Sequence, residues 1–147
     1  MIRDSIPMSE YTVLCVDDDE AICELYQAAF PAWGHRAVTS MSPLQALNTI
    51  GNQDVQFDAI LLDYEMPEMN GAELAAEIKR QHPNLPIMMV SGNAEIVRHA
   101  PQFVDITIAK GSELALLISQ IENLIVSHRN PKPAQPFRWT VADTASA

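Results

Sequence analysis

Residues 59–78 read AILLDYEMPEMNGAELAAEI. The stretch opens with four apolar residues, which predict a short buried strand that stops at the carboxylate of Asp63. A loop follows, and Asn70 and Glu73 then have the spacing of a capping box, which begins a helix. The predicted inner face of that helix consists of Leu74, Ala75 and Ile78. The stretch therefore predicts one strand–loop–helix unit with an acidic residue at the end of its strand.

The same alternation of apolar runs and amphipathic segments continues on both sides of this stretch. Further short strands are expected at residues 11–16, 36–39, 87–90 and 106–109. Strands that alternate with helices form parallel sheets with helices on both faces. The near-continuous apolar character of the runs fits a sheet that is buried on both sides. The fold class is therefore predicted to be α/β, built from repeated βα units.

Some segments carry expectations about single residues. In the helix after the first strand, four apolar residues have the spacing of a single helical face, and we expect them to face inward: Ile22, Leu25, Tyr26 and Ala29. Pro31 is expected to end that helix, and Ser112 is expected to cap the last one. The four histidines lie in segments that we expect at the surface or at helix ends, and we do not assign them as metal ligands: His35, His82, His99 and His128.

The composition is that of an acidic globular protein. The chain has 147 residues, of which 48% are hydrophobic and 19% charged, enough for one domain with its own core. Its 19 acidic and 9 basic residues give a net charge of −10, which disfavours binding to nucleic acids and to anionic membranes. No apolar run approaches the length of a membrane helix, and residues 1–9 lack the apolar centre of a secretory signal. The spacing of Cys15 and Cys23 fits neither a disulfide framework nor a zinc site, so we interpret them as ordinary thiols. We therefore expect a cytoplasmic protein.

The chain is expected to contain one folded domain between two less ordered ends. We assign residues 1–10 to an N-terminal extension and residues 11–128 to the domain. Residues 129–147 contain three closely spaced prolines and end in small residues, so we expect a tail that is disordered or loosely docked. Alternating apolar residues in that tail leave a short strand or a partner-binding peptide as the alternative: Phe137, Trp139 and Val141.

Polar residues stand where four of the predicted strands end. Asp17 and Asp18 follow the first strand, Asp63 the third, Ser91 the fourth and Lys110 the fifth. In an open parallel sheet, ligands bind at the edge where the carboxyl ends of the strands lie. We therefore expect three carboxylates, a hydroxyl and an ammonium group at a common site.

The carboxylates would repel one another at such a site, by about 4 kcal/mol for two unit charges about 4 Å apart at an effective dielectric constant of about 20. A bound cation relieves that repulsion, and an incomplete set of oxygen ligands suits Mg²⁺, which keeps some of its waters. A carboxylate can itself attack phosphorus, while Ser91 and Lys110 can bind phosphoryl oxygens. The residues therefore provide the parts for Mg²⁺-dependent phosphoryl transfer.

Four segments resemble the motifs of two-component response-regulator receiver domains. Residues 13–20 (VLCVDDDE) resemble the acidic-pair motif, residues 60–71 (ILLDYEMPEMNG) the phosphoacceptor motif and residues 86–92 (PIMMVSG) the fourth-strand motif, while Lys110 matches the lysine of the fifth strand. The resemblance extends from about residue 11 to about residue 127. It implies a flavodoxin-like (βα)5 fold, a doubly wound parallel sheet with strand order 2-1-3-4-5.

The resemblance also implies roles for the acidic residues. Asp63 would accept a phosphoryl group from a sensor histidine kinase or a histidine phosphotransfer protein. Asp63 and Asp18 would ligate Mg²⁺ directly, and Asp17 would do so largely through water. The main-chain carbonyl of Glu65 would be a further ligand.

Ser91 and Lys110 would then hold the phosphoryl group beside Asp63. Such a domain changes a protein-interaction surface when it is phosphorylated, and we expect no turnover of a separate substrate. We expect no DNA-binding output domain either.

Three departures from the family pattern lie away from the acidic cluster. Gly111 follows the lysine where the family has a proline with a cis peptide bond, and Thr107 replaces an aromatic residue that couples to the position of Ser91. The segment between Ser91 and Lys110 is also shorter than usual. We therefore assign Ser91 and Thr107 to the switch position and expect the departures to affect signal output more than phosphorylation.

Three further residues are expected to tune the site: Glu65, Gly92 and Asn93. The Glu65 side chain is able to pair with Lys110 when no phosphoryl group is present, and it would repel the group when it is bound. We therefore expect slow phosphorylation or altered autodephosphorylation.

Two alternative functions stay open. A degenerate receiver would act as an unphosphorylated protein-interaction module, which Thr107 and Gly111 favour and the intact acidic residues oppose. An aspartate-nucleophile phosphatase of the haloacid-dehalogenase type would use Asp63 and Glu65 as a DxD-like pair, but that family places its nucleophile on the first strand. The downstream protein and the oligomeric state are not predicted.

Overall fold

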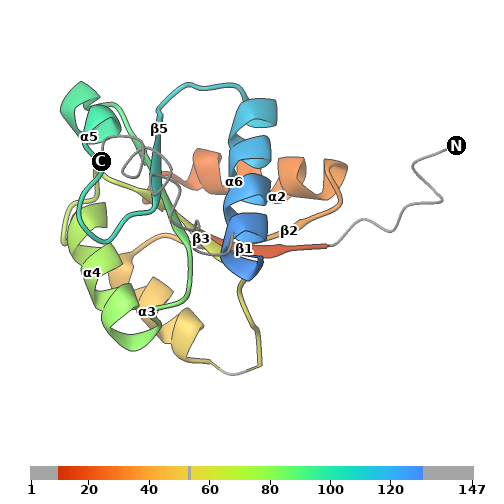
Figure 1. Ribbon diagram of the computed structural model, residues 1–147, viewed down its shortest axis with the longest axis horizontal. Helices are drawn as coiled ribbons and strands as arrows, with labels where there is room; N and C mark the ends of the chain where they lie inside the picture. The colour runs from red at the N-terminus through yellow and green to blue at the C-terminus, as the bar shows by residue number, and fades with distance from the viewer. Residues whose placement is uncertain (1–9, 53, 131–147) are drawn as a thin grey trace, which may run out of the picture.

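The computed structural model describes residues 10–52 and 54–130. Of the expected N-terminal extension and tail, only Glu10, Arg129 and Asn130 are described, and both expectations otherwise lie outside the described residues. One sheet of five parallel strands runs through the domain in the order β2-β1-β3-β4-β5 (Figure 1). The strands are β1 (Thr12–Val16), β2 (Arg36–Ser40), β3 (Ala59–Asp63), β4 (Ile87–Ser91) and β5 (Ile106–Ala109). The predicted fold class and strand order are confirmed.

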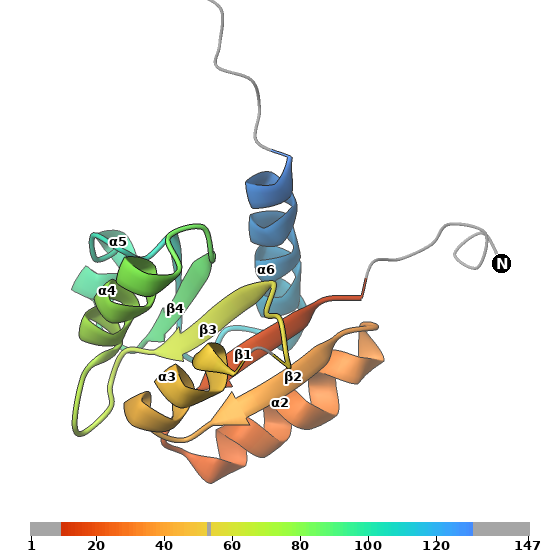
Figure 2. The same ribbon diagram turned by 90° about the horizontal axis from the view of Figure 1, so that it is seen from below.

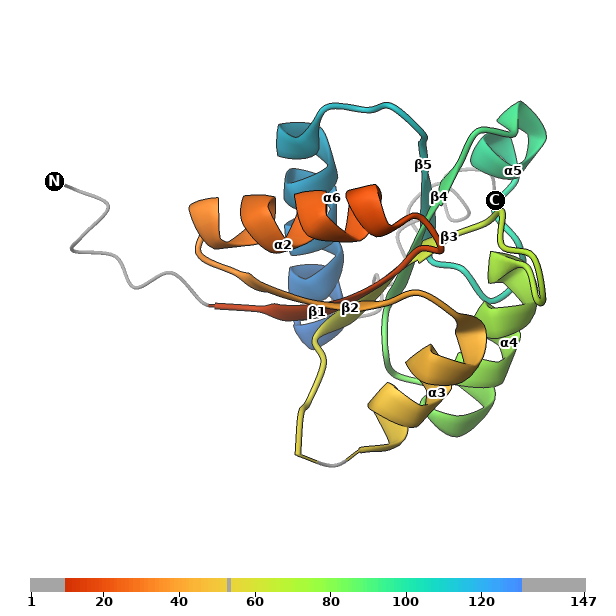
Figure 3. The same cartoon turned by 180° about the vertical axis from the view of Figure 1, so that it is seen from behind.

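Helices cover both faces of this sheet. They are α2 (Glu20–Ala32), α3 (Pro43–Gly51), α4 (Gly71–Gln81), α5 (Ala94–Arg98) and α6 (Leu114–Arg129). α2 and α6 lie on one face, where Phe30 and Ile118 join an apolar cluster with the strands, and α3 and α4 lie on the other, where Ala46 and Leu74 do the same (Figure 3). The short helix α5 packs against β4 and β5, at the β5 edge of the sheet, and lies close to β4 in Figure 2. Within the described part of the chain, no helix is both long and apolar enough to span a membrane.

The unit formed by β3 and α4 is fixed at both ends. Every residue of β3 is buried, as the apolar run predicts. The predicted capping box begins α4: Asn70 Oδ1 accepts from the N–H of Glu73 at 2.9 Å, and Glu73 Oε1 accepts from the N–H of Asn70 at 3.0 Å. These bonds satisfy two N–H groups that a helix start leaves free. The loop between strand and helix is thereby held at its far end.

The inner face predicted for α2 is wrong in part. Leu25 is 44% exposed, and the buried residues of the helix are Cys23, Tyr26 and Phe30. The helix face that packs on the sheet is therefore rotated away from Leu25, toward Cys23 and Phe30. Pro31, expected to end the helix, lies within its last turn.

The turn between β5 and α6 also differs from expectation. Ser112 does not cap α6: its hydroxyl donates to the carbonyl of Ala109 at 2.6 Å, and Glu113 takes the N-cap position without a side-chain cap bond. Gly111 has a φ of +86°, which a proline cannot adopt, and no described peptide bond is cis. Gly111 therefore supports a trans turn directly after Lys110.

His35 is buried, contrary to the expectation of a surface position. Its ring is stacked on Tyr11 with 5.2 Å between the centroids, and its Nδ1 accepts from the N–H of Tyr11 at 3.2 Å. Its Nε2 lies 2.6 Å from Oε2 of Glu122 in α6. Because Nδ1 accepts, Nε2 carries the proton and donates to Glu122. This bond ties α6 to the sheet.

Candidate functional site

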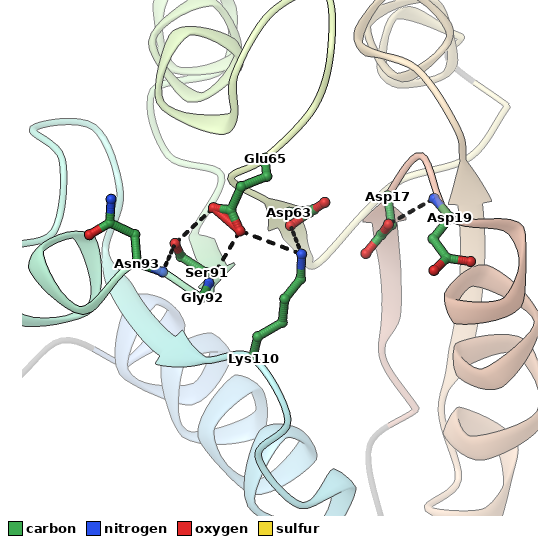
Figure 4. Close-up of polar contacts among 8 residues, drawn as sticks. All are labelled: Asp17, Asp19, Asp63, Glu65, Ser91, Gly92, Asn93 and Lys110. Atoms are coloured by element: carbon green, nitrogen blue, oxygen red, sulfur yellow. Dashed lines mark hydrogen bonds and ion pairs between the residues drawn. The ribbon is translucent and has the colours of Figure 1, made fainter.

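The carboxyl ends of the strands bring the predicted site residues together (Figure 4). Asp63 ends β3 and Ser91 ends β4, while Asp17 and Lys110 directly follow β1 and β5. The strand register pairs Asp63 with Val90 and Ser91 with Ala109, so these ends lie at the same height in the sheet. One edge therefore carries every residue that the sequence assigned to the chemistry.

Three carboxylates cluster on the β1 side of this edge. Asp17, Asp18 and Asp63 each place one oxygen within 4.8 Å of the other two. Asp17 and Asp63 are buried and Asp18 is exposed. A set of carboxylate oxygens open to solvent on one side suits Mg²⁺, which takes oxygen ligands and retains waters. The residues present thus fit the expected cation.

The acidic cluster carries an electrostatic cost in the absence of a cation. Burial, together with the nearby charges of Asp63 and Asp18, raises the pKa of Asp17 to about 6, although the hydrogen bond from the N–H of Asp19 and the charge of Lys110 lower it. Burial also raises the pKa of Asp63 more than Lys110 lowers it. Both carboxylates are therefore held in a setting that opposes their charge.

Lys110 faces this cluster from the β5 side. Its Nζ lies 3.1 Å from Oδ1 of Asp63 and 3.4 Å from Oε1 of Glu65. Burial alone would lower the pKa of Lys110, but Asp63 and Glu65 raise it above its ordinary value. The lysine is therefore a fixed positive charge beside the side chain predicted to accept phosphoryl.

Glu65 makes more contacts than the sequence indicated. Besides Lys110, its carboxylate accepts from the hydroxyl of Ser91 at 2.9 Å and from the N–H of Gly92 at 3.2 Å. Burial would raise the pKa of Glu65, but the bonds from Gly92 and Ser91 together with the Lys110 charge lower it. The pairing of Glu65 with Lys110 was expected, whereas the bonds to Ser91 and Gly92 were not.

Asn93 and Thr107 lie around Ser91 with separate partners. The N–H of Asn93 donates to the hydroxyl oxygen of Ser91 at 2.9 Å, and the Asn93 side chain caps α5. The hydroxyl of Thr107 donates to the carbonyl of Val97 in α5 at 2.6 Å. The structure thus joins Thr107 to α5 and gives it no hydrogen bond to Ser91.

Sequence reasoning missed two contacts that support the acidic residues. The N–H of Gly71 donates to the carbonyl of Tyr64 at 2.9 Å, and the α-carbon of Gly71 faces the main chain of Asp63 so closely that a side chain would collide with it. The thiol of Cys23 donates to the carbonyl of Asp17 at 3.3 Å. A glycine directly after a helix N-cap was a visible signal for the first contact. The second had no signal beyond an ordinary thiol.

The comparison with protein families agrees with this geometry. Residues 13–122 match the response regulator receiver domain, and the chain belongs to that family. It is therefore a receiver domain of the kind used in two-component signalling. In this chain the acidic pair follows the first strand and Asp63 ends the third, an order opposite to the one expected for the phosphatase alternative.

Curated relatives are longer proteins. The transcriptional regulatory protein ZraR of Klebsiella oxytoca is 34% identical over 84 residues, which cover 57% of this chain and 18% of ZraR. The response regulator SaeR of Staphylococcus aureus is 30% identical over 83 residues, which cover 56% of this chain and 35% of SaeR. The matched stretch therefore spans about a third or less of the length of these relatives.

Solved structures share the fold. TrrA from Thermotoga maritima, in complex with Mg²⁺–BeF, superposes with a TM-score of 0.70 at 23% identity and covers 78% of this chain and 98% of its own. A CheY-like receiver domain protein from Methanospirillum hungatei gives a TM-score of 0.73 at 23% identity, over 84% and 100% of the two chains. NtrX from Brucella abortus gives 0.75 at 27% identity, over 92% of this chain and 30% of NtrX.

Proposed function

We propose that this chain is the phosphoacceptor of a two-component or phosphorelay system, and that Asp63 receives the phosphoryl group from a phosphohistidine of a sensor kinase or a phosphotransfer protein. One observation carries the proposal. The Asp63 carboxylate lies between the acidic pair and Lys110, 3.1 Å from its ammonium nitrogen. The nucleophile therefore has a place for a cation on one side and a positive charge for the phosphoryl oxygens on the other.

The acidic cluster is the place for Mg²⁺. Asp17, Asp18 and Asp63 would hold the cation, with the main-chain carbonyl of Glu65 as a further ligand, and TrrA was solved with Mg²⁺–BeF. Bound Mg²⁺ offsets the negative charge of the carboxylates and of the phosphoryl oxygens. Without it, a phosphorylated donor would approach three carboxylates.

The transfer exchanges one bond to phosphorus for another. A carboxylate oxygen of Asp63 forms the new O–P bond while the N–P bond of the phosphohistidine breaks, and the histidine nitrogen leaves with the bonding electrons. Lys110 remains charged throughout and pairs with a phosphoryl oxygen. The hydroxyl of Ser91 and the N–H of Gly92 donate to the other oxygens, so the product is held by three kinds of donor.

Intact mass spectrometry tests the proposal with acetyl phosphate as a small donor. We expect one phosphoryl adduct on the full chain in the presence of Mg²⁺, none after chelation of the metal, and none on the Asp63→Asn variant. An adduct that persists in Asp63→Asn, or that forms equally well without Mg²⁺, contradicts the assignment.

One observation favours a second candidate, an unphosphorylated protein-interaction module. Glu65 already supplies a negative charge to the donors that would hold the phosphoryl group. Such a module would take no phosphoryl group from acetyl phosphate or from a phosphorylated kinase, whether or not Mg²⁺ is bound. The adduct experiment therefore separates the two candidates.

A further inference from the structure

The carboxylate of Glu65 occupies the donor groups beside Asp63. The hydroxyl of Ser91 donates to Oε2 of Glu65 at 2.9 Å, the N–H of Gly92 donates to Oε1 at 3.2 Å, and Nζ of Lys110 lies 3.4 Å from Oε1 (Figure 4). The same Nζ lies 3.1 Å from Oδ1 of Asp63. A hydroxyl, a main-chain amide and an ammonium group thus converge on one carboxylate.

These donors cannot serve Glu65 and a phosphoryl group at the same time. The hydroxyl of Ser91 and the amide of Gly92 each have a single hydrogen, and Glu65 already accepts both. A phosphoryl group on Asp63 would also bring a charge of about −1.5 to −2 to the nitrogen that now faces Glu65. Two anions would then compete for one lysine.

The surroundings of Ser91 leave Glu65 as the partner that must move. The N–H of Asn93 donates to the oxygen of the Ser91 hydroxyl, which keeps that hydroxyl's hydrogen for Glu65. Thr107 is bound to the carbonyl of Val97 instead. The side chain of Glu65 is 44% exposed, so part of it already faces solvent.

We propose that Glu65 is an internal competitor of the phosphoryl group: its carboxylate holds Ser91, Gly92 and Lys110 in the unphosphorylated chain and is expelled to the surface when Asp63 is phosphorylated. This inference rests on the proposed function of Asp63. It makes phosphorylation slower, because bonds to Glu65 break before the donors can bind the incoming group. It also makes the release of one acidic side chain near α4 and α5 the first change at the surface.

The contact itself is tested on the unphosphorylated, metal-free full chain by nuclear magnetic resonance. The amide proton of Gly92 is the probe, because a carboxylate acceptor shifts such a proton downfield. We expect it to move upfield in Glu65→Ala and to stay in place in Glu68→Gln. Glu68 is an exposed acid of the same loop, so its variant removes one negative charge near the site.

The competition is tested by the rate at which acetyl phosphate and Mg²⁺ produce the adduct. We expect Glu65→Ala and the nearly isosteric Glu65→Gln to react about tenfold faster than the natural chain, the factor for one net charge-assisted bond that no longer has to break. Glu68→Gln should react at the natural rate. The difference should persist at about 1 M salt, where the Debye length is about 3 Å and general repulsion of the donor is screened.

Each result decides between the possibilities. An unmoved Gly92 amide in Glu65→Ala overturns the contact, and unchanged rates in both Glu65 variants overturn the competition. A rate gain that disappears at high salt also overturns it, since general repulsion then explains the gain. If the amide responds but no variant accepts a phosphoryl group, the proposed function has failed, and the competition fails with it while the contact stands.

Discussion

Gly71, the first residue of α4, lies against the main chain that carries Asp63. A Cβ at this position would lie 2.6 Å from the carbonyl oxygen of Asp63 and 2.9 Å from Cε of Met89. The methionine end can rotate away, but the carbonyl belongs to a strand that is paired with neighbours on both sides. Only a residue without a side chain therefore lets α4 begin this close to β3.

We predict that Gly71→Ala is less stable by about 1–3 kcal/mol, the usual cost of forcing an extra carbon into a packed site. The substitution also displaces the main chain of Asp63, so adduct formation with acetyl phosphate should slow. Urea unfolding and intact mass spectrometry measure the two effects.

Gly51 supplies the matched control. It ends α3, and a Cβ there would meet no atom within 4 Å. Gly51→Ala should be as stable as the natural chain or more stable, by up to about 1 kcal/mol, because alanine favours the helix. If Gly71→Ala behaves like Gly51→Ala in both measurements, the close approach does not position Asp63.

At the residue scale, the sequence predicts which residues stand at the ends of strands, but it does not predict hydrogen bonds between residues that are far apart in the chain. Asp63 and Ser91 could be predicted because each follows an apolar run, and parallel strands end at one edge. The bond between Glu65 and Ser91 joins residues 26 positions apart, and that between His35 and Glu122 joins residues 87 positions apart. No local pattern encodes either bond, since each depends on where two elements meet.

Among the elements, α5 depends most on a single tertiary bond. It spans Ala94–Arg98 and has no buried residue, so little apolar packing holds it. The carbonyl of Val97 in its last turn accepts from the hydroxyl of Thr107 on β5 at 2.6 Å. Thr107 therefore ties the end of α5 to the sheet.

We predict that Thr107→Val, which keeps the shape and removes the hydroxyl, loosens α5 locally. Loss of one hydrogen bond, about 1 kcal/mol, should speed hydrogen exchange at the amides of Val97 and His99 about fivefold. Both amides bond within the helix, to Asn93 and Glu95, so they report its opening. The phosphorylation rate should not change, because the Thr107 hydroxyl makes no bond to Ser91.

Thr49 provides the comparison for this substitution. Its hydroxyl bonds to the carbonyl of Gln45 within its own helix, so Thr49→Val should leave the exchange of α5 unchanged. Natural exchange rates at Val97 and His99 in Thr107→Val would mean that other contacts hold the end of α5. A slower phosphorylation rate would instead mean that Thr107 contributes to the phosphorylation site itself.

At the scale of the elements, the sequence predicted the order and type of helices and strands correctly. It predicted the buried faces and the caps of the helices only in part. The capping box at Asn70 and Glu73 is a local signal, and it was confirmed. The inner face of α2 was misjudged because Leu25 and Cys23 flank Tyr26 on either side, and only the position of the sheet decides between them. Ser112 was misjudged because the turn at Gly111 directs its hydroxyl back to β5.

For the whole molecule, the acidic cluster couples stability to pH and to metal. The chain has a net charge of −10, and its site buries Asp17 and Asp63 together. The folded-state pKa of Asp17 is about 6, above its unfolded value of 3.8. The stabilising contribution of its proton is therefore fully present below the unfolded pKa and is lost as the pH rises through about 6. Above that pH the folded chain holds an uncompensated carboxylate.

A cation bound at the acidic cluster should restore the stabilisation that the proton on Asp17 provides at low pH. Mg²⁺ binds the charged form of Asp17, so it competes with the proton and binds more weakly below about pH 6. Binding to the folded state alone adds about 2.7 kcal/mol when the free metal is 100-fold above its dissociation constant. The gain from Mg²⁺ thus depends on pH through the same carboxylates that the proposed function uses.

We predict that Mg²⁺ raises the free energy of unfolding clearly at about pH 7.5 and little at about pH 5, because Asp17 is charged only at the higher pH. Urea unfolding with and without Mg²⁺ at both pH values measures this gain. Asp17→Asn should lose most of the gain and, without metal, be more stable than the natural chain at the higher pH, since one buried charge is gone. Glu68→Gln removes an exposed charge and should keep both behaviours. An equal gain at both pH values, or a full gain in Asp17→Asn, would place the cation away from Asp17 and leave the raised pKa without a role in metal binding.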